Sequence, residues 1–264
     1  MIWFAAYLAT GVLVGFLAGL LGIGGGMVMV PILAALFAAQ GFAPDHVLHL
    51  ALGTSMAAIL FTASSSAREH HRLGAVDWSV VRRMAPGIAG GTLLATLASG
   101  QVPQQAMAAA FAVIVVLAAT QIGFGRKPGP ARRMPGALGT SLAGGLIGIV
   151  CGLASVGGAF MTVPFMLWCG VPVRTAIGSG AALGLPIAVM GTLGYAIAGW
   201  HVTGLPAGSI GFVQTTALAG VVVTSMLVAP WGARLAHRLP VATLRRVFAL
   251  MLYAMAAKML WAYV

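Results

Sequence analysis

A glycine-rich stretch that occurs twice limits the fold of this chain more than any other feature of its sequence. The first copy runs from Gly22 to Pro31 (GIGGGMVMVP), and a divergent copy runs from Ser155 to Pro164 (SVGGAFMTVP). An alignment of residues 11–31 with 144–164 contains nine identities in 21 positions. Chance matching in so apolar a chain would give roughly two. The chain therefore contains an internal duplication.

Each copy predicts a break in a helix. Glycine lets other groups approach the backbone closely, and proline removes an amide donor. Inside a membrane, irregular backbone persists only where protein buries it or where it lines a cavity. Two such copies, one in each half, are typical of the central binding site of a transporter.

The composition places the chain in a membrane. Hydrophobic residues make up 60% of it and charged residues 6%, with a mean hydropathy of +1.02, which leaves too little polar surface for a soluble domain. The start, Met1-Ile2-Trp3-Phe4, has no basic region, so we expect a first membrane helix and not a removed signal peptide. The net charge of +11 comes from short clusters between apolar segments, which indicates positive-inside anchoring and argues against nucleic-acid binding.

Ten apolar segments predict an all-α, polytopic membrane protein with about ten transmembrane or half-membrane helices. The segments are 3–22, 27–40, 47–66, 79–99, 104–124, 137–155, 159–170, 175–199, 206–230 and 241–262. Because a full span needs roughly 20 residues, the short second and seventh segments predict half-membrane or interior helices.

The segments form two sets of five, and an odd number of elements inverts the second repeat relative to the first. We expect a first membrane repeat over residues 1–124, a cytoplasmic linker over 125–136 that is rich in Pro, Gly and Arg, and a second membrane repeat over 137–264. Basic loops on alternate connections, one of them carrying Arg68 and Arg72, place both termini outside.

The acidic residues favour an anionic or neutral substrate. Asp45, Glu69 and Asp77 are the chain's three acids, and all fall in predicted loops or at helix entrances. Coupling to protons or sodium, like binding of a cation, usually needs an acidic group at membrane depth.

Hydroxyl and backbone groups offer ligands for a small oxyanion. Thr54, Ser55 and Ser179 follow glycines at which we expect helices to begin, and helix N-termini present free amides. These hydroxyls could equally bond a carbonyl one turn earlier in their own helix.

No metal, cofactor or enzymatic activity is expected. His70 and His71 are adjacent in a predicted loop, which makes a poor metal site. Cys151 and Cys169 have no Cys-x-x-Cys partner and indicate packing. The segment 177–180 (IGSG) lacks the leading glycine of a serine-nucleophile motif, and no mid-helix histidine follows it.

The stretch from Gly19 to Pro31, followed by Gly53-Thr54-Ser55 and by the second Gly-Gly-x5-Pro copy, resembles the TauE/SafE family of sulfite and organosulfonate exporters. The resemblance implies a multi-pass permease of the bacterial inner membrane that exports small sulfur oxyanions or sulfonates. Carried over by motif, it implies a substrate site made of Gly24, Gly25, Gly26, Pro31, Gly53, Thr54, Ser55, Gly157, Gly158, Pro164, Gly178 and Ser179. The second copy has Ser155 and Ala159 where the first has Gly22 and Gly26, so the halves need not contact the substrate equally.

Two basic residues extend this candidate site. His49 stands four residues before Gly53, and Arg174 stands four residues before Gly178. A base at a helix N-terminus opposes the helix dipole, and an approaching anion would explain both. Arg174 could instead be another positive-inside anchor.

The expected partners are a small anionic substrate and the lipid bilayer, and a homodimer is among the oligomeric states that the sequence leaves open. The alternative function is a membrane-embedded scaffold or assembly factor without transport. Substrate flux in liposomes separates these two functions.

The inverted repeat makes a prediction about topology. Single cysteines at Gln40 and Gly100, in a background without the native cysteines, should react with an impermeant thiol reagent from outside intact cells, and a cysteine at Gly129 should react only from inside. Labelling of positions 100 and 129 from the same side would contradict the inverted arrangement.

Overall fold

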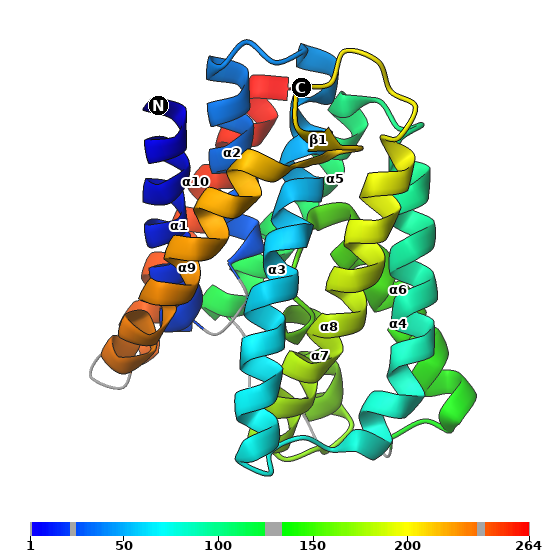
Figure 1. The fold of residues 1–264 in the computed structure, drawn as a ribbon. Helices are drawn as coiled ribbons and strands as arrows, with labels where there is room; N and C mark the ends of the chain where they lie inside the picture. The colour runs from blue at the N-terminus through cyan, green and yellow to red at the C-terminus, as the bar shows by residue number, and fades with distance from the viewer. Residues whose placement is uncertain (1, 22–24, 125–133, 237–240, 264) are drawn as a thin grey trace.

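The computed structural model describes residues 2–21, 25–124, 134–236 and 241–263, which fold into an all-α bundle (Figure 1). Its α-helices are α1 (Ile2–Leu21), α2 (Gly26–Ala39), α3 (Val47–Arg72), α4 (Trp78–Ser99), α5 (Gln104–Phe124), α6 (Ala137–Ala154), α7 (Ala159–Trp168), α8 (Val173–Ala198), α9 (Thr215–Ala236) and α10 (Val241–Tyr263). A short 3-10 helix, η1 (Pro44–His46), precedes α3. The predicted all-α fold with two short helices, α2 and α7, is confirmed.

One predicted boundary is wrong. The ninth apolar segment, 206–230, begins as a hairpin of β1 (Ser209–Ile210) and β2 (Val213–Gln214), in which Ser209 pairs with Gln214, and its helix starts only at Thr215. Gly208 and Gly211 have left-handed backbone, with φ of 78° and 55°, which no helix tolerates in its interior.

The two halves are inverted copies of each other. Helices α3 and α8 each contain 26 residues, and α4 and α9 each contain 22. Helix α1 packs against α9, and its counterpart α6 packs against α4 in the same way. Helices α3 and α8 run antiparallel, because Gly53 approaches Tyr195 while Ala63, further along α3, approaches Gly184, earlier in α8.

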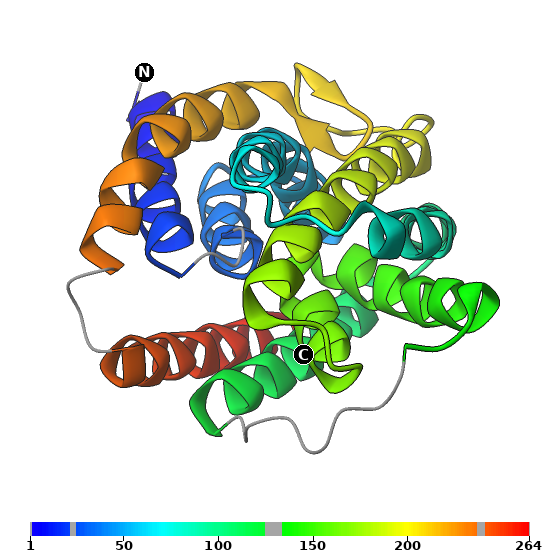
Figure 2. The same ribbon diagram turned by 90° about the horizontal axis from the view of Figure 1, so that it is seen from below.

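Helices α3 and α8 cross at the centre of the bundle. Seen along the bundle in Figure 2, the α1–α9 pair lies on one side of them, the α4–α6 pair on another, and α5 packs against α10 on a third. Helices α2 and α7 pack against α3 and α8 respectively, so each short helix of the duplicated motif lies beside a central helix.

The outer surface is apolar, as lipid contact requires. Leu94, Leu117, Leu146 and Leu227 lie on four different helices, and each is between 64% and 69% exposed. Four helical segments in the described residues are long and apolar enough to cross a membrane: Pro44–Arg72, Gln104–Ile122, Ala137–Ala154 and Val173–Ala198. With its long apolar helices and shorter apolar ones, the chain is a multi-pass membrane protein.

Most arginines lie at one end of the bundle. We call the end at which α1 begins and α10 ends the terminal face, and the opposite end, where α3 ends and α8 begins, the arginine face (Figure 1). The helix ends at the arginine face carry Arg68, Arg72, Arg82, Arg83, Arg174, Arg234, Arg245 and Arg246. Arg68 and Arg72, expected in a loop with His70 and His71, instead occupy the last turns of α3, where basic residues complement the helix dipole.

Close backbone approach holds the outer helix pairs together. Gly91 of α4 faces Gly145 of α6 so closely that an added Cβ would overlap the Gly145 carbonyl oxygen. Nothing lies within 4 Å of a Cβ added at the neighbouring Gly90, which is exposed. These two adjacent glycines therefore offer a matched pair of positions.

We expect Gly91→Ala to lower the stability of the protein by about 1–3 kcal/mol, because the helices must separate to admit the methyl group. Gly90→Ala should leave it unchanged or raise it by up to about 1 kcal/mol, since alanine favours a helix over glycine. Melting temperatures of both variants in detergent provide the measurement, and equal melting temperatures would show that the α4–α6 contact is not tight.

Candidate substrate site at the two helix breaks

The duplicated glycine motif interrupts a helix in each half. Helix α1 ends at Leu21 and α2 begins at Gly26, while α6 ends at Ala154 and α7 begins at Ala159. Gly25 has left-handed backbone with φ of 65°, and so does Ser155 with φ of 47°, a conformation that side chains other than glycine's adopt at an energetic cost. Gly24 lies outside the described residues.

The two breaks touch. A Cβ added at Gly26 would overlap the Ser155 carbonyl oxygen, and one added at Gly158 would lie 2.8 Å from the Gly184 amide nitrogen of α8. Ser155 also donates its hydroxyl to the Leu52 carbonyl oxygen of α3 at 2.7 Å. Backbone from both halves, including the buried Gly157, therefore meets inside the bundle, as the duplication predicts.

The prolines of the motif lie inside the short helices and not at the breaks. Pro31 is the sixth residue of α2 and is buried, and Pro164 is the sixth residue of α7 and is half-buried. At the sixth position each proline removes the one intrahelical bond that its amide would make, yet both helices continue past it. The glycines thus break the helix.

Thr54 of α3 binds the connection that follows α8, and Ser179 of α8 binds the connection that follows α3. The Thr54 hydroxyl accepts a hydrogen bond from the Gln214 amide at 2.9 Å, and the Ser179 hydroxyl accepts one from the Asp77 amide, also at 2.9 Å. The adjacent Gly53 and Gly178 admit the carbonyl oxygens of Phe212 and Ala75. The two hydroxyls therefore accept equivalent hydrogen bonds in the two repeats.

Helices α3 and α8 begin earlier than the motif suggests. They start at Val47 and Val173, so Gly53 and Gly178 lie in the second turn, where amides bond within the helix. The expectation that free amides flank these glycines is wrong, because the apolar residues before them continue the helix.

Gly53 and Gly178 also lie at opposite ends of the central pair. Gly53 packs against Tyr195, and the separation of 17 positions along α8 between Gly178 and Tyr195 corresponds to about 25 Å. One small anion therefore does not contact both Thr54 and Ser179.

Ser55 differs from Thr54 and Ser179 because its hydroxyl is fully buried and has no hydrogen-bond partner. The repeat places Gly180 at the equivalent position of α8, and a Cβ there would lie 2.9 Å from Val163 and 3.0 Å from Thr162 of α7. By the repeat, the element equivalent to α7 is α2, which packs against α3.

Comparison with known proteins places the chain in a family. Residues 7–259 match the family described as sulfite exporter TauE/SafE. The chain belongs to the TauE/SafE family. A "probable membrane transporter protein" of Haemophilus influenzae is 36% identical to it over 253 residues, covering 96% of each chain. The "probable membrane transporter protein YdhB" of Bacillus subtilis is 26% identical over 242 residues, covering 88% of this chain and 90% of its own. This TauE/SafE protein is therefore a membrane transporter and not an enzyme.

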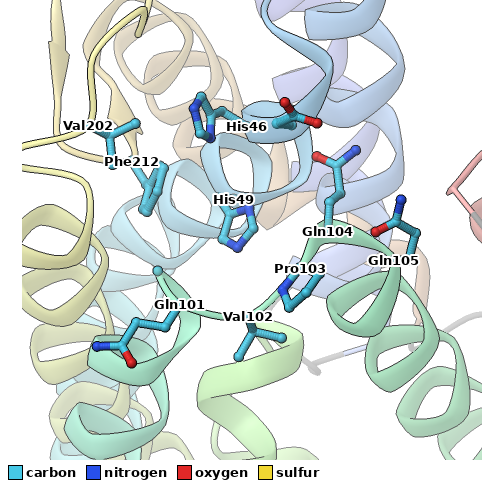
Figure 3. A pocket seen from close by; sticks show the side chains of 11 residues that line it. His46, His49, Gln101, Val102, Pro103, Gln104, Gln105, Val202 and Phe212 are labelled. Atoms are coloured by element: carbon cyan, nitrogen blue, oxygen red, sulfur yellow. The ribbon is translucent and has the colours of Figure 1, made fainter.

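The two basic candidates of this TauE/SafE protein lie at opposite faces. Arg174 is exposed at the start of α8, at the arginine face, and His49 is 4% exposed in the first turn of α3, at the terminal face. A pocket of about 300 Å³ adjoins His49. Figure 3 shows His49 between Phe212 on one side and Pro103 and Gln104 on the other.

Sequence reasoning missed most of that pocket. Its polar lining includes Gln101 from the α4–α5 connection and Gln104 and Gln105 from the start of α5, which no motif marks. A signal did exist for the hairpin. Near the ends of the two repeats, equivalent residues such as Pro103 and Pro240 are 137 positions apart, and the same spacing matches Asp77 with Gln214. The amides of these two residues bond Ser179 and Thr54.

Proposed function

We propose that this TauE/SafE transporter exports small sulfur-containing anions, such as sulfite or organosulfonates, across the bacterial inner membrane. The family description supplies the substrate class, and the distribution of charge supports it. The names of the two relatives specify transport without a substrate.

The placement of the acids is the observation that carries the proposal. Asp45 lies in η1, Glu69 in the last turn of α3, and Asp77 at the N-terminus of α4, so all three of the chain's acids lie at the ends of the bundle. A cation in the interior would have no carboxylate to neutralise it, whereas an anion would meet hydroxyls and amides.

Asp77 has a structural task that keeps it ionised. Its carboxylate accepts hydrogen bonds from the Ser79 hydroxyl at 2.6 Å, the Ser79 amide at 2.9 Å and the Val80 amide at 3.3 Å. The bond from the Ser79 side chain, above all, holds the pKa of this carboxyl below its usual value. A carboxylate that caps a helix is poorly suited to carry a proton.

We place the substrate at the two helix breaks. Gly25 directly precedes α2, which begins at Gly26, and Gly158 directly precedes α7. The first amides of a helix have no partner within it. The dipoles of both short helices add positive potential there. Ser55, whose hydroxyl is buried without a partner, supplies a donor next to the first break.

We expect export to need no coupling ion, because the membrane potential, negative inside, drives an anion outward. A monoanion gains roughly 2.3 kcal/mol per 100 mV, enough for a gradient of about fiftyfold. Proteoliposomes loaded with sulfite, sulfoacetate, sulfate or a taurine-derived sulfonate provide the test, with an imposed potassium-diffusion potential at equal pH on both sides. Flux that follows the potential supports the proposal. Flux that ignores the potential and follows a proton gradient refutes uncoupled export, and an absence of flux for every anion favours a scaffold without transport.

We expect Ser55→Ala to weaken the apparent affinity for the transported anion by about fivefold to tenfold, the value of one hydrogen bond. Stability should not fall, because the lost hydroxyl has no partner in the free protein. Ser64→Ala is the matched control in the same helix, since the Ser64 hydroxyl already bonds the Leu60 carbonyl oxygen at 2.7 Å. Equal affinities in the two variants would exclude Ser55 from the site.

A further inference from the structure

We propose that the pocket beside His49 is a second binding site for a small oxyanion, reached from the terminal face, and that binding there takes up one proton on His49. The inference extends the proposed function, since it assigns to the same class of substrate a site on the opposite side of the polar interior from the arginine face.

Two helix N-termini border the pocket. Gln104 and Gln105 are the first residues of α5, and His46 directly precedes α3. The Gln104 side chain accepts a hydrogen bond from the Leu48 amide through Oε1 at 3.1 Å, which leaves its amide nitrogen as a donor. The first amides of α5 and the positive ends of two helix dipoles favour an anion at this position.

His49 gives the pocket a second, independent indication of a ligand. Its Nε2 lies 3.0 Å from the Ser99 carbonyl oxygen, and since a carbonyl only accepts, Nε2 must carry a proton. Its Nδ1 is buried with no hydrogen-bond partner, an arrangement that buried polar atoms rarely keep. The Phe212 ring, 5.0 Å away between centroids, holds the imidazole in place.

The bond to Ser99 couples anion binding to a proton. Because Nε2–H is already used, neutral His49 presents only the lone pair of Nδ1, which repels an anion. Protonation of Nδ1 converts it into a charged donor, so an oxyanion binds the imidazolium form. Affinity should therefore rise as pH falls, until His49 is protonated in the free protein as well.

Few other charges surround His49. Asp45, exposed, and His46 are the other titratable groups that line the pocket. The α4–α5 connection and the start of α5 contribute the uncharged residues from Gly100 to Gln105, and the hairpin region contributes Val202 and Phe212. His201, next to Val202, is exposed and is not part of the lining. Without lysine or arginine in this lining, the charge that attracts an anion depends on the histidines.

Polar side chains join this pocket to the second helix break. The Tyr195 hydroxyl donates to the Gly152 carbonyl oxygen at 3.1 Å and lies beside the hydroxyls of Ser155 and Ser99. His49 bonds the carbonyl of the same Ser99. The pocket beside His49 at the terminal face would thus be connected by polar groups to the proposed site at the helix breaks.

Methanesulfonate, whose sulfonate stays singly charged over the tested range, is the probe. Calorimetric titration of the purified full chain in detergent should show affinity at least about tenfold weaker at pH 8 than at pH 6, since one linked proton gives up to tenfold per pH unit. His49→Gln should bind weakly with a flat pH profile, whereas His201→Gln should match the unmodified protein. In histidine-labelled protein, methanesulfonate should shift the Nδ1 resonance that His49→Gln removes.

Asp45→Asn provides a variant at an exposed residue, and loss of this like charge should tighten binding about twofold to threefold. Unaltered affinity and pH dependence in His49→Gln, or a His49 resonance that ignores methanesulfonate, would overturn the inference even if liposomes transport sulfonates. A responsive His49 in a protein that transports no sulfonate would retain this site and refute the export function instead.

Discussion

Backbone groups at the two helix breaks must find partners inside the protein, because the surrounding hydrocarbon offers none. The structure meets this constraint by bringing the breaks together: Gly26 lies against the Ser155 carbonyl, and the Ser155 hydroxyl bonds the Leu52 carbonyl. Only glycine allows the approach at position 26. This contact joins the two halves beside the central helix α3, against which α2 packs.

The two repeats share the hydrogen bonds that close the ends of the bundle, but the side chains at those ends differ. Thr54 and Ser179 each hold the amide that starts the next element, so the inverted halves share one way of closing the bundle ends. The residue that enters beside the motif glycine is Phe212 at the terminal face and Ala75 at the arginine face. The large ring packs against His49, and the two faces of the transporter thereby acquire different chemistry.

The distribution of charged side chains makes the two ends of this nearly symmetric bundle different. Arginines gather where α3 ends and α8 begins, and glutamines and histidines, of which only His49 is buried, line the pocket at the other face. An anion that approaches the arginine face would meet permanent positive charge first. At the terminal face, under the proposed protonation of His49, it would meet positive charge that is lost together with the proton, which would favour capture on one side and release on the other.

Much of the fold was predictable from the sequence, because the length of an apolar segment, the absence of interior carboxylates and a glycine-rich repeat are local properties. They determined the membrane class, ten helices, the two breaks and the inverted order. Tertiary structure alone decided what the motif residues do: Thr54 bonds an amide 160 residues away and Ser179 one 102 residues away. It also decided that Pro31 and Pro164 continue their helices and that His49 adjoins a pocket. Hydrogen-bond partners so distant in the chain are set by how helices pack, which no local pattern encodes.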